Sequence, residues 1–171
     1  FQKIKIPEKE LEKNIPESLS KIYYWCSAEG YLDRIKTSTK INSGLLDGIP
    51  LPGGRLKWLD NISINSMVED FKESGFRGAI NRYRAQELDW LELKELDSLF
   101  ITQPSIFIGG EYDPVRSFIK NYDAYKNAGR YCSNFKGSFI IKKAGHWVQQ
   151  EKPDEVNKII KKFLSNLKKS V

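Results

Sequence analysis

Two short stretches decide the fold of this chain: SIFIGGEYDP at positions 105–114 and SFIIKKAGHWVQQEKP at positions 138–153. Each opens with a short, mainly apolar run, which is typical of a strand buried on both faces of a parallel sheet. Parallel strands need a crossover connection, and the mixed segment between the two runs is predicted to hold a crossover helix. The sequence therefore predicts two parallel strands, with Asp113 following the first and His146 following the second.

Asp113 and His146 are suited to act as an acid and a base. His146 is the only histidine of the chain, and an imidazole with an ordinary pKa of about 6.5 can take up a proton near neutral pH. A carboxylate bonded to the other ring nitrogen fixes the tautomer and stabilises the cation. Both residues are predicted to lie beyond the C-terminal ends of parallel strands, where open α/β sheets bind their ligands.

Each residue alone also has a purely structural interpretation. Asp113 can form an Asp-Pro turn, and His146 can cap or pack. Their occurrence together, with the acid before the histidine, favours a catalytic pair. A nucleophile elbow of the Gly-x-Ser-x-Gly kind is absent from the sequence, so the pair lacks an evident nucleophile within the chain.

The part of the chain before the strands is predicted to be helical. Apolar residues recur every three or four positions from 7 to 30, with a break near Pro16. The stretch 37–57 is rich in glycine and proline and is predicted to be a long loop.

Further helices are predicted on either side of the strands. Asp60 is expected to cap a helix that Gly75 ends, and a following helix is expected to open at Gly78 and to carry Tyr83. The last helix begins at Pro153, a residue tolerated in a first turn. It is predicted to bury a stripe of apolar residues: Val156, Ile159, Ile160, Phe163, Leu164 and Leu167.

The composition of the chain limits the classes of function that it can have. A chain of 171 residues that is 40% hydrophobic can form a globular core. Its net charge of +6 is scattered, and the densest basic group lies on the last helix, which favours a solvated face over a nucleic-acid site. No apolar stretch approaches the roughly 20 residues that span a bilayer, so we expect no membrane insertion. Cys26 and Cys132 have no metal-ligand spacing, and we expect buried thiols in a reducing compartment.

The chain is expected to be a piece of a longer protein, called the parent protein below. Its first residue is Phe1 and its only methionine is Met67. A signal peptide would lie upstream, so a cytoplasmic location is assigned by default. Two parallel strands cannot form an independent sheet, because each needs paired neighbours and cover on both faces. We therefore expect the chain to fold poorly or to aggregate when it is produced alone.

Three segments closely resemble the soluble epoxide hydrolases of the α/β-hydrolase superfamily: GFRGAINRYR at 75–84, the segment around Asp113, and GHWVQQEKP at 145–153. The match is collinear over nearly the whole chain. The resemblance implies the C-terminal portion of an α/β-hydrolase fold, with an incomplete parallel sheet. Residues 1–99 would form the helical cap and residues 100–171 the C-terminal part of the core.

The resemblance also implies an activity, the hydrolysis of an epoxide to a vicinal diol through a covalent alkyl-enzyme ester. An aspartate nucleophile upstream of Phe1 would open the ring, while Tyr83 donates a hydrogen bond to the epoxide oxygen. His146, oriented by Asp113, would then activate the water that hydrolyses the ester. The implied partners are a small epoxide and water, with no metal and no organic cofactor, and the oligomeric state stays open.

Two of these residues keep alternative interpretations. Pattern alone favours Tyr83 as a core tyrosine that faces Ile80 across one helical turn. Relatives often carry tryptophan where this chain has Arg82, which changes the shape and polarity of the implied pocket. Trp147, beside the histidine, is assigned to substrate binding, and its alternative role is to wedge the last helix against the sheet.

Other functions share parts of the pattern. A haloalkane dehalogenase uses the same aspartate, acid and histidine but holds a halide with ring N–H groups. An esterase would carry serine as the nucleophile. A non-catalytic α/β-hydrolase would bind a small ligand without turning it over. Tyr83 favours the epoxide hydrolase among these.

Overall fold

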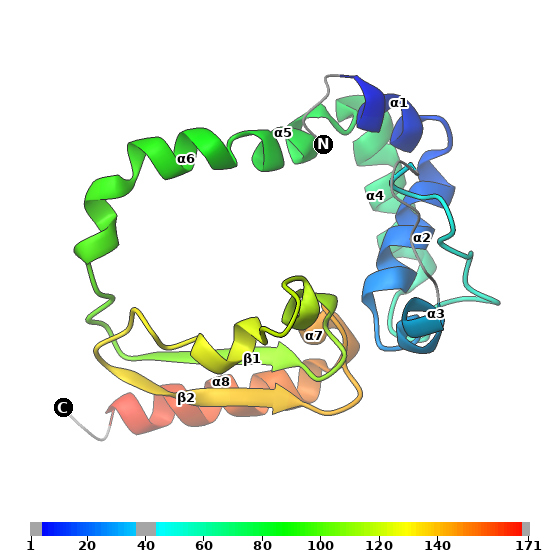
Figure 1. Ribbon diagram of the computed structural model, residues 1–171. Coiled ribbons are helices and arrows are strands. Elements are labelled where there is room, and N and C mark those ends of the chain that lie inside the picture. Colours follow the sequence, from blue (N-terminus) through cyan, green and yellow to red (C-terminus); the bar gives the residue numbers. More distant parts are fainter. Residues whose placement is uncertain (1–4, 37–43, 169–171) are drawn as a thin grey trace. The chain divides into compact units, whose positions relative to one another are not determined.

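The structure, a computed structural model, describes residues 5–36 and 44–168. It contains two compact units (Figure 1): unit 1 is Phe1–Trp25 with Leu32–Ser98, and unit 2 is Cys26–Tyr31 with Leu99–Val171. Unit 1 holds helices, and unit 2 holds the two strands with the helices that follow them. The short segment Cys26–Tyr31 therefore packs with unit 2, although its neighbours on both sides in the sequence belong to unit 1.

The described part of unit 1 is built from short helices. The predicted break near Pro16 is present: α1 ends at Glu12 and α2 begins at Ile15. Pro16 lies in the first turn of α2, where its missing N–H leaves no helical hydrogen bond unmade. The helices are α1 (Ile6–Glu12), α2 (Ile15–Cys26), α3 (Tyr31–Lys36), α4 (Asn61–Ser74), α5 (Arg77–Arg84), α6 (Gln86–Glu92) and the 3₁₀ helix η1 (Lys94–Ser98).

The predicted signals at the ends of α4 are confirmed. The Asp60 side chain accepts a hydrogen bond from the Ser63 backbone N–H at 2.8 Å, which satisfies an N–H at the first turn. Gly75 ends the helix with a φ of 65°, a conformation that glycine adopts without steric cost. The next helix, α5, begins at Arg77, one residue before the predicted Gly78, and carries Tyr83.

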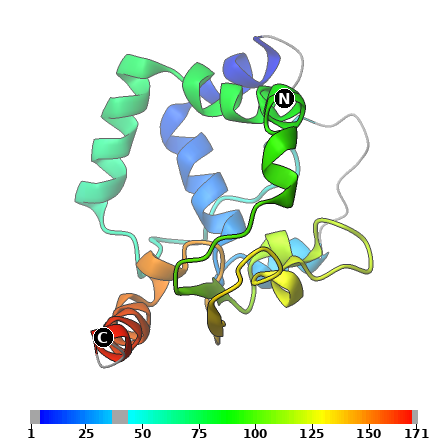
Figure 2. The ribbon, with the colours of Figure 1, turned by 90° about the vertical axis from the view of Figure 1, so that its left-hand side faces the viewer.

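The core of unit 1 joins the helices whose apolar periodicity is visible in the sequence. Leu11 and Leu19, from α1 and α2, pack with Val68 of α4, and Phe76 and Ile80 complete the buried cluster. Figures 1 and 2 show α2 and α4 from two directions at right angles. Each apolar side chain withdrawn from water contributes roughly 1.5–3 kcal/mol, so this cluster holds together helices that are too short to be stable alone.

An ion pair attaches α5 to α1. Arg84 donates from Nη1 to Glu8 Oε1 at 2.6 Å and from Nη2 to Glu8 Oε2 at 2.9 Å. The hydrogen bond from Arg84 lowers the pKa of Glu8 to about 2, so the carboxylate stays ionised over the whole neutral range. The helix that carries Tyr83 is thereby held to the rest of unit 1.

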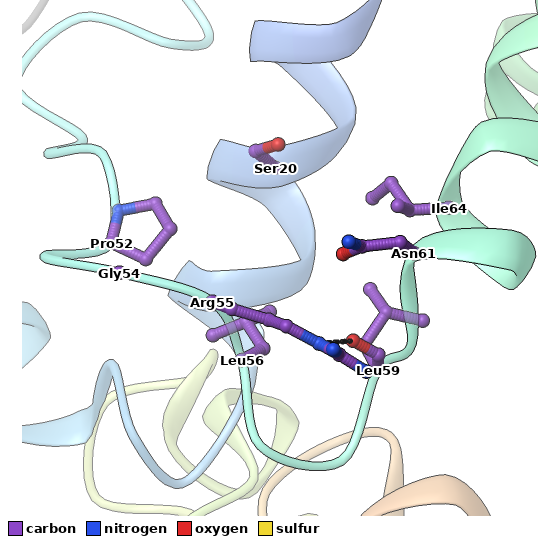
Figure 3. A pocket seen from close by; sticks show the side chains of 8 residues that line it. All are labelled: Ser20, Pro52, Gly54, Arg55, Leu56, Leu59, Asn61 and Ile64. Carbon is purple, nitrogen blue, oxygen red and sulfur yellow. Dashed lines mark hydrogen bonds between the residues drawn. The ribbon is translucent and has the colours of Figure 1, made fainter.

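The loop before α4 lines a small cavity. Residues 44–57 lack helix and strand, as predicted, whereas positions 37–43 of the predicted loop lie outside the described residues. Figure 3 shows the Arg55 side chain reaching across the opening to donate to the Leu59 carbonyl at 3.4 Å. The cavity holds ≈ 140 Å³, less than the roughly 300–1,000 Å³ of typical ligand sites. It is lined by Ser20, Pro52, Gly54, Arg55, Leu56, Leu59, Asn61 and Ile64.

Unit 2 contains the predicted pair of parallel strands, but the predicted burial of the second strand is wrong, because Phe139 and Ile140 are 38% and 40% exposed. The strand β1 (Ser105–Gly110) pairs with β2 (Phe135–Ile141), with Ile108 opposite Phe139 and Gly110 opposite Ile141. Both strands extend beyond the predicted apolar runs. They are followed by α7 (Val148–Glu151) and α8 (Pro153–Lys168), and Figure 1 shows α8 running alongside the strands.

The prediction of a crossover helix between the strands is wrong. The connection instead holds two 3₁₀ helices, η2 (Pro114–Ser117) and η3 (Ala124–Asn127). Asp113 and Asp123 each accept a hydrogen bond from the backbone N–H two residues later, and Asn121 has a φ of 62°. Such side-chain contacts with the local backbone compete with α-helix and favour turns.

The last helix has the predicted bounds at its start but buries less than predicted. Val156 is buried, whereas Ile160 and Leu164 are 39% and 51% exposed. Two strands contact only part of the helix's apolar stripe, and the remainder faces outward. Among the residues that the structure describes, none of the helices is both long and apolar enough to cross a bilayer.

We expect this chain, produced by itself, to self-associate through exposed apolar surface. Phe118 and Ile119 are 74% and 64% exposed in unit 2, and Trp90 is 66% exposed in unit 1, and contiguous exposed apolar groups promote association. Dye binding by 8-anilinonaphthalene sulfonate and sedimentation velocity measure this directly. A monomer that leaves the dye fluorescence unchanged and unfolds in one cooperative transition would contradict the expectation.

Candidate active site

The two strand ends place the predicted acid and histidine side by side. Asp113 follows β1 and caps η2, and His146 lies in the loop between β2 and α7. The Tyr112 backbone N–H donates to the Ala144 carbonyl at 2.8 Å, which ties the two loops together. Parallel strands end at one edge of a sheet, and the site lies at that edge.

Two glycines permit the close approach of these loops. A Cβ atom on Gly110 would collide with the carbonyl oxygens of Ala144 and Gly145. A Cβ atom on Gly145 would collide with the backbone of the segment Cys26–Tyr31. Main chain therefore contacts main chain on both sides of the histidine loop, and larger residues at either position would push the loops apart.

The hydrogen bond predicted between Asp113 and His146 is present. His146 Nδ1 lies 2.9 Å from Asp113 Oδ2. The Asp113 side chain is 4% exposed, whereas the His146 side chain is 41% exposed. The carboxylate is thus shielded from water, and the imidazole is accessible to a small molecule.

Asp113 is kept ionised by several donors. Burial by itself would raise the pKa of this carboxyl group, but hydrogen bonds from His146, from the Tyr125 hydroxyl and from the Val115 backbone N–H together lower it. The Val115 N–H donates to Oδ1 at 2.8 Å, and the other two groups bond to Oδ2. A buried carboxylate with this many donors remains charged at neutral pH.

His146 is made more basic by its surroundings. The hydrogen bond to Asp113 raises the pKa of the imidazole, burial lowers it, and the charges of Asp113 and Glu151 raise it further, with a net upward shift. An accessible imidazole whose other nitrogen is held by an ionised carboxylate can remove a proton from water. The arrangement is compatible with the general-base role expected for His146, which stays a prediction.

Tyr125 is a site residue that the sequence pattern did not identify. It lies on η3, and its hydroxyl donates to Asp113 Oδ2, the oxygen that also binds His146. Burial and the bond to the carboxylate raise the pKa of the phenol, which therefore stays protonated as a donor. Nothing in the sequence distinguishes Tyr125 from Tyr122 nearby, because the contact depends on how the connection between the strands folds back.

The Tyr125 ring is itself held in place. It contacts Phe107 of β1 edge-on at a centroid distance of 4.6 Å. The Arg116 guanidinium lies 5.7 Å from the ring centroid and bonds to Asp123 Oδ2 at 2.6 Å. The Asp123 carboxylate also accepts from the Tyr125 backbone N–H at 3.0 Å. These contacts fix the phenol that bonds to Asp113.

Trp147 contacts the histidine directly. The two rings meet edge-on, with centroids 5.0 Å apart. Trp147 is half-buried at the start of α7, and its contact limits the rotation of the imidazole. Its assignment to substrate binding remains a prediction.

Tyr83 lies in unit 1, on α5. Its side chain is 47% exposed, whereas Ile80, one turn earlier, is 3% exposed and belongs to the core. The neighbouring Arg82 bonds to Asp89 at 2.9 Å on the exposed side of the helix. The phenol of Tyr83 is therefore only half removed from water, and its role toward a substrate remains a prediction.

The site is built from groups that move protons. In the described part of the chain, His, Cys, Asp and Glu side chains nowhere gather in threes as metal ligands would. Asp113 has three donors already, and His146 uses Nδ1 for Asp113. Acid–base chemistry by Asp113 and His146 stays a prediction.

Several known epoxide hydrolases are similar in sequence to this chain. Epoxide hydrolase A of Mycobacterium tuberculosis is 33% identical over 124 residues, which cover 72% of this chain and 37% of that protein. Epoxide hydrolase B of the same organism is 28% identical and covers 93% of the chain and 50% of that protein. Bifunctional epoxide hydrolase 2 of Rattus norvegicus is 30% identical over 96% of the chain and 28% of its own length. No protein-family model matches the chain.

Solved structures show the same similarity. An epoxide hydrolase from an endophytic Streptomyces superposes with a TM-score of 0.86 at 29% identity, covering 98% of this chain and 51% of that one. Epoxide hydrolase A from Mycobacterium thermoresistibile has a TM-score of 0.82 at 25% identity, covering 96% of this chain and 50% of that one. The chain thus spans about half of each of these structures.

We expect replacement of Tyr125 by phenylalanine to raise the pKa of His146. The ring contacts with Phe107 and Arg116 are kept, and only the hydroxyl that shares Asp113 Oδ2 is removed, so the full charge of that oxygen faces the imidazole. Titration of the ¹³C-labelled histidine ring by NMR in the parent protein measures the shift, with the signal assigned by its loss in His146→Gln.

Tyr122→Phe is the matched control for this change. Tyr122 lies on the same connection and its hydroxyl accepts a bond from Asn127 at 3.3 Å, away from the carboxylate. Its removal is expected to leave the histidine titration unchanged. A histidine pKa that stays constant or falls in Tyr125→Phe would show that the phenol does not compete for Asp113.

Proposed function

The chain has the fold of the C-terminal portion of an α/β-hydrolase and is epoxide hydrolase-like, and from this premise we propose that its parent protein hydrolyses epoxides to vicinal diols. The observation that carries the proposal is the Asp113–His146 hydrogen bond at 2.9 Å beyond the ends of two parallel strands, in a chain similar to several epoxide hydrolases. We assign residues 1–99 to the helical cap and residues 100–171 to the C-terminal part of the core.

In the first proposed step, a carboxylate nucleophile opens the epoxide. We assign this group to an aspartate of the parent protein outside the present chain. Its oxygen forms a bond to one epoxide carbon while the bond from that carbon to the ring oxygen breaks. The ring oxygen gains negative charge, and Tyr83 donates a hydrogen bond and then a proton to it. The product is an alkyl-enzyme ester with a free hydroxyl group.

In the second proposed step, His146 activates water. The neutral imidazole removes a proton, and the resulting hydroxide attacks the ester carbonyl carbon. The bond from that carbon to the alkyl oxygen breaks, the alkyl oxygen takes the proton of the new carboxyl group to complete the diol, and the carboxylate is restored. The imidazolium then returns its proton through water to the tyrosinate that Tyr83 became in the first step. Asp113 stabilises the imidazolium while it exists, and the Tyr125 and Val115 donors keep Asp113 ionised for this purpose. Small epoxide and water are the only reactants.

The basicity of His146 sets the expected pH dependence. The histidine acts as a base only when neutral, so ester hydrolysis is expected to rise with pH through the raised pKa of the imidazole. A haloalkane dehalogenase or esterase would use the same histidine, and the similarity to named epoxide hydrolases is what favours an epoxide as substrate.

We expect His146→Gln in the parent protein to form the ester and to hydrolyse it slowly. Incubation with styrene oxide should raise the intact mass by the mass of one epoxide, because the first step is retained and the second has lost its base. The 171-residue chain alone is expected to form no diol. Diol production by His146→Gln at the unaltered rate would refute the role given to the histidine.

Tyr83→Phe is expected to lower kcat for styrene oxide roughly 10²-fold, as the loss of a proton donor typically does. Tyr131→Phe is the matched control, because Tyr131 is 53% exposed in unit 2 and is packed beside Arg130 and Phe100. The control should retain its activity. Equal kcat values in the two variants would remove Tyr83 from the mechanism, and failure to hydrolyse any epoxide would refute the function itself.

A further inference from the structure

Glu151 is a second carboxylate beside the histidine loop, and the proposed mechanism does not use it. It is the last residue of α7 and is half-buried. Both of its oxygens lie 3.0 Å from the Gly145 backbone N–H, and Oε2 also accepts from the Ala28 backbone N–H at 2.9 Å. The Trp147 backbone N–H is a further donor. The carboxylate thus accepts hydrogen bonds from N–H groups on both sides of His146 in the sequence.

The segment Cys26–Tyr31 is the other partner of this carboxylate. Besides Ala28, it supplies the Cys26 carbonyl, which accepts from the His146 backbone N–H at 2.9 Å. At its far end the Tyr31 ring stacks on Tyr112, with centroids 4.2 Å apart. The segment is therefore bonded both to the histidine loop and to the loop that carries Asp113.

We propose that Glu151 is a positioning residue that clamps the segment Cys26–Tyr31 to the histidine loop and thereby holds the His146 backbone where its ring meets Asp113. The catalytic part of this proposal rests on the proposed function, whereas the clamp itself is a property of unit 2. The clamp also requires glycine at position 145, because a side chain on Gly145 would occupy the space of the clamped segment.

A carboxylate is suited to this position, and an amide is not. A carboxylate accepts at both oxygens and donates at neither, so it can serve N–H groups from two loops at once. A glutamine would turn an NH₂ group toward at least one of those N–H donors. Three backbone donors also stabilise the charge of a group that burial makes harder to ionise.

The charge of Glu151 reaches the histidine as well. Asp113 and Glu151 are the carboxylates that act on His146, and both raise the pKa of the imidazole. Burial raises the pKa of the Glu151 carboxyl group, the N–H groups of Ala28, Gly145 and Trp147 lower it, and the charge of Glu29 on the clamped segment raises it, with a net upward shift. Glu151 therefore adds both a structural and an electrostatic effect at the base.

Hydrogen–deuterium exchange on the parent protein tests the clamp without any substrate. Glu151→Gln is expected to increase deuterium uptake together in peptides that cover residues 26–31 and 143–147. Glu155→Gln is the matched control, because Glu155 is exposed in the first turn of α8 and undergoes the same chemical change. It should leave both peptides unchanged. Increased uptake confined to residues 143–147, or in neither peptide, would overturn the clamp.

The pH profile of diol formation tests the effect on the histidine. Removing the Glu151 charge lowers the pKa of His146, so the rising limb of kcat against pH is expected to move to lower pH in Glu151→Gln, with kcat at its plateau reduced about 10-fold or more and KM changed less. Glu151→Asp keeps the charge but has a shorter side chain. Its kcat at the plateau is expected to fall, while the rising part of its kcat–pH curve stays nearer that of the natural protein.

These outcomes separate the clamp from the proposed function. If the rising part of the kcat–pH curve does not move in Glu151→Gln, Glu151 does not raise the pKa of His146. If kcat at the plateau of that curve is unchanged, Glu151 does not position the histidine. If the parent protein hydrolyses no epoxide, the proposed function fails, yet coordinated exchange at residues 26–31 and 143–147 would still support the clamp.

Discussion

The candidate site depends on the direct contact of two loops that follow parallel strands. Gly110 at the end of β1 has no side chain to hold the loop before His146 away, and backbone hydrogen bonds join the two loops. The acid and the histidine are therefore positioned by main chain, which is stiffer than long side chains. Once the loops are this close, the buried Asp113 carboxylate must find partners, because an unpaired buried charge is strongly destabilising. His146, Tyr125 and the Val115 N–H supply them.

Two carboxylates serve different parts of one histidine. Asp113 bonds to the ring and affects its tautomer and basicity. Glu151 bonds to the backbone N–H groups that flank the histidine and to the segment Cys26–Tyr31. Each carboxylate has donors of its own, so neither needs the other's partners. The ring and the backbone of His146 are thus fixed by separate sets of contacts, which is how a side chain is held within the small tolerance that acid–base chemistry needs.

The two units contribute unequal parts of the functional argument. Unit 2 carries the Asp113–His146 pair, in which a buried carboxylate bonds to an accessible imidazole. Unit 1 carries Tyr83 on a helix anchored by the Glu8–Arg84 ion pair, and the role proposed for Tyr83 rests on the similarity to epoxide hydrolases. The chain spans half or less of the length of the curated relatives that it matches, and for this reason the activity of the parent protein is a proposal that rests on the base and on the similarity together.

The amino-acid sequence by itself determined most of the local elements and identified Asp113 and His146 as a candidate pair. Apolar runs predicted both strands, Asp60 and Gly75 predicted the ends of α4, and the positions of Asp113 and His146 after the strands predicted that they would meet. These features depend on short-range periodicity and turn chemistry, which a single sequence carries. Tertiary structure alone decided that Tyr125 bonds to Asp113 and that Cys26–Tyr31 packs on the histidine loop through Glu151. The 3₁₀ turns of the strand connection have local signals in Asp113 and Asp123, which apolar periodicity does not reveal. The bond between Tyr125 and Asp113 depends on how the connection between the strands folds back. The Glu151 contacts include one to the Ala28 N–H, which is distant in sequence, and backbone N–H groups carry no mark in the sequence pattern.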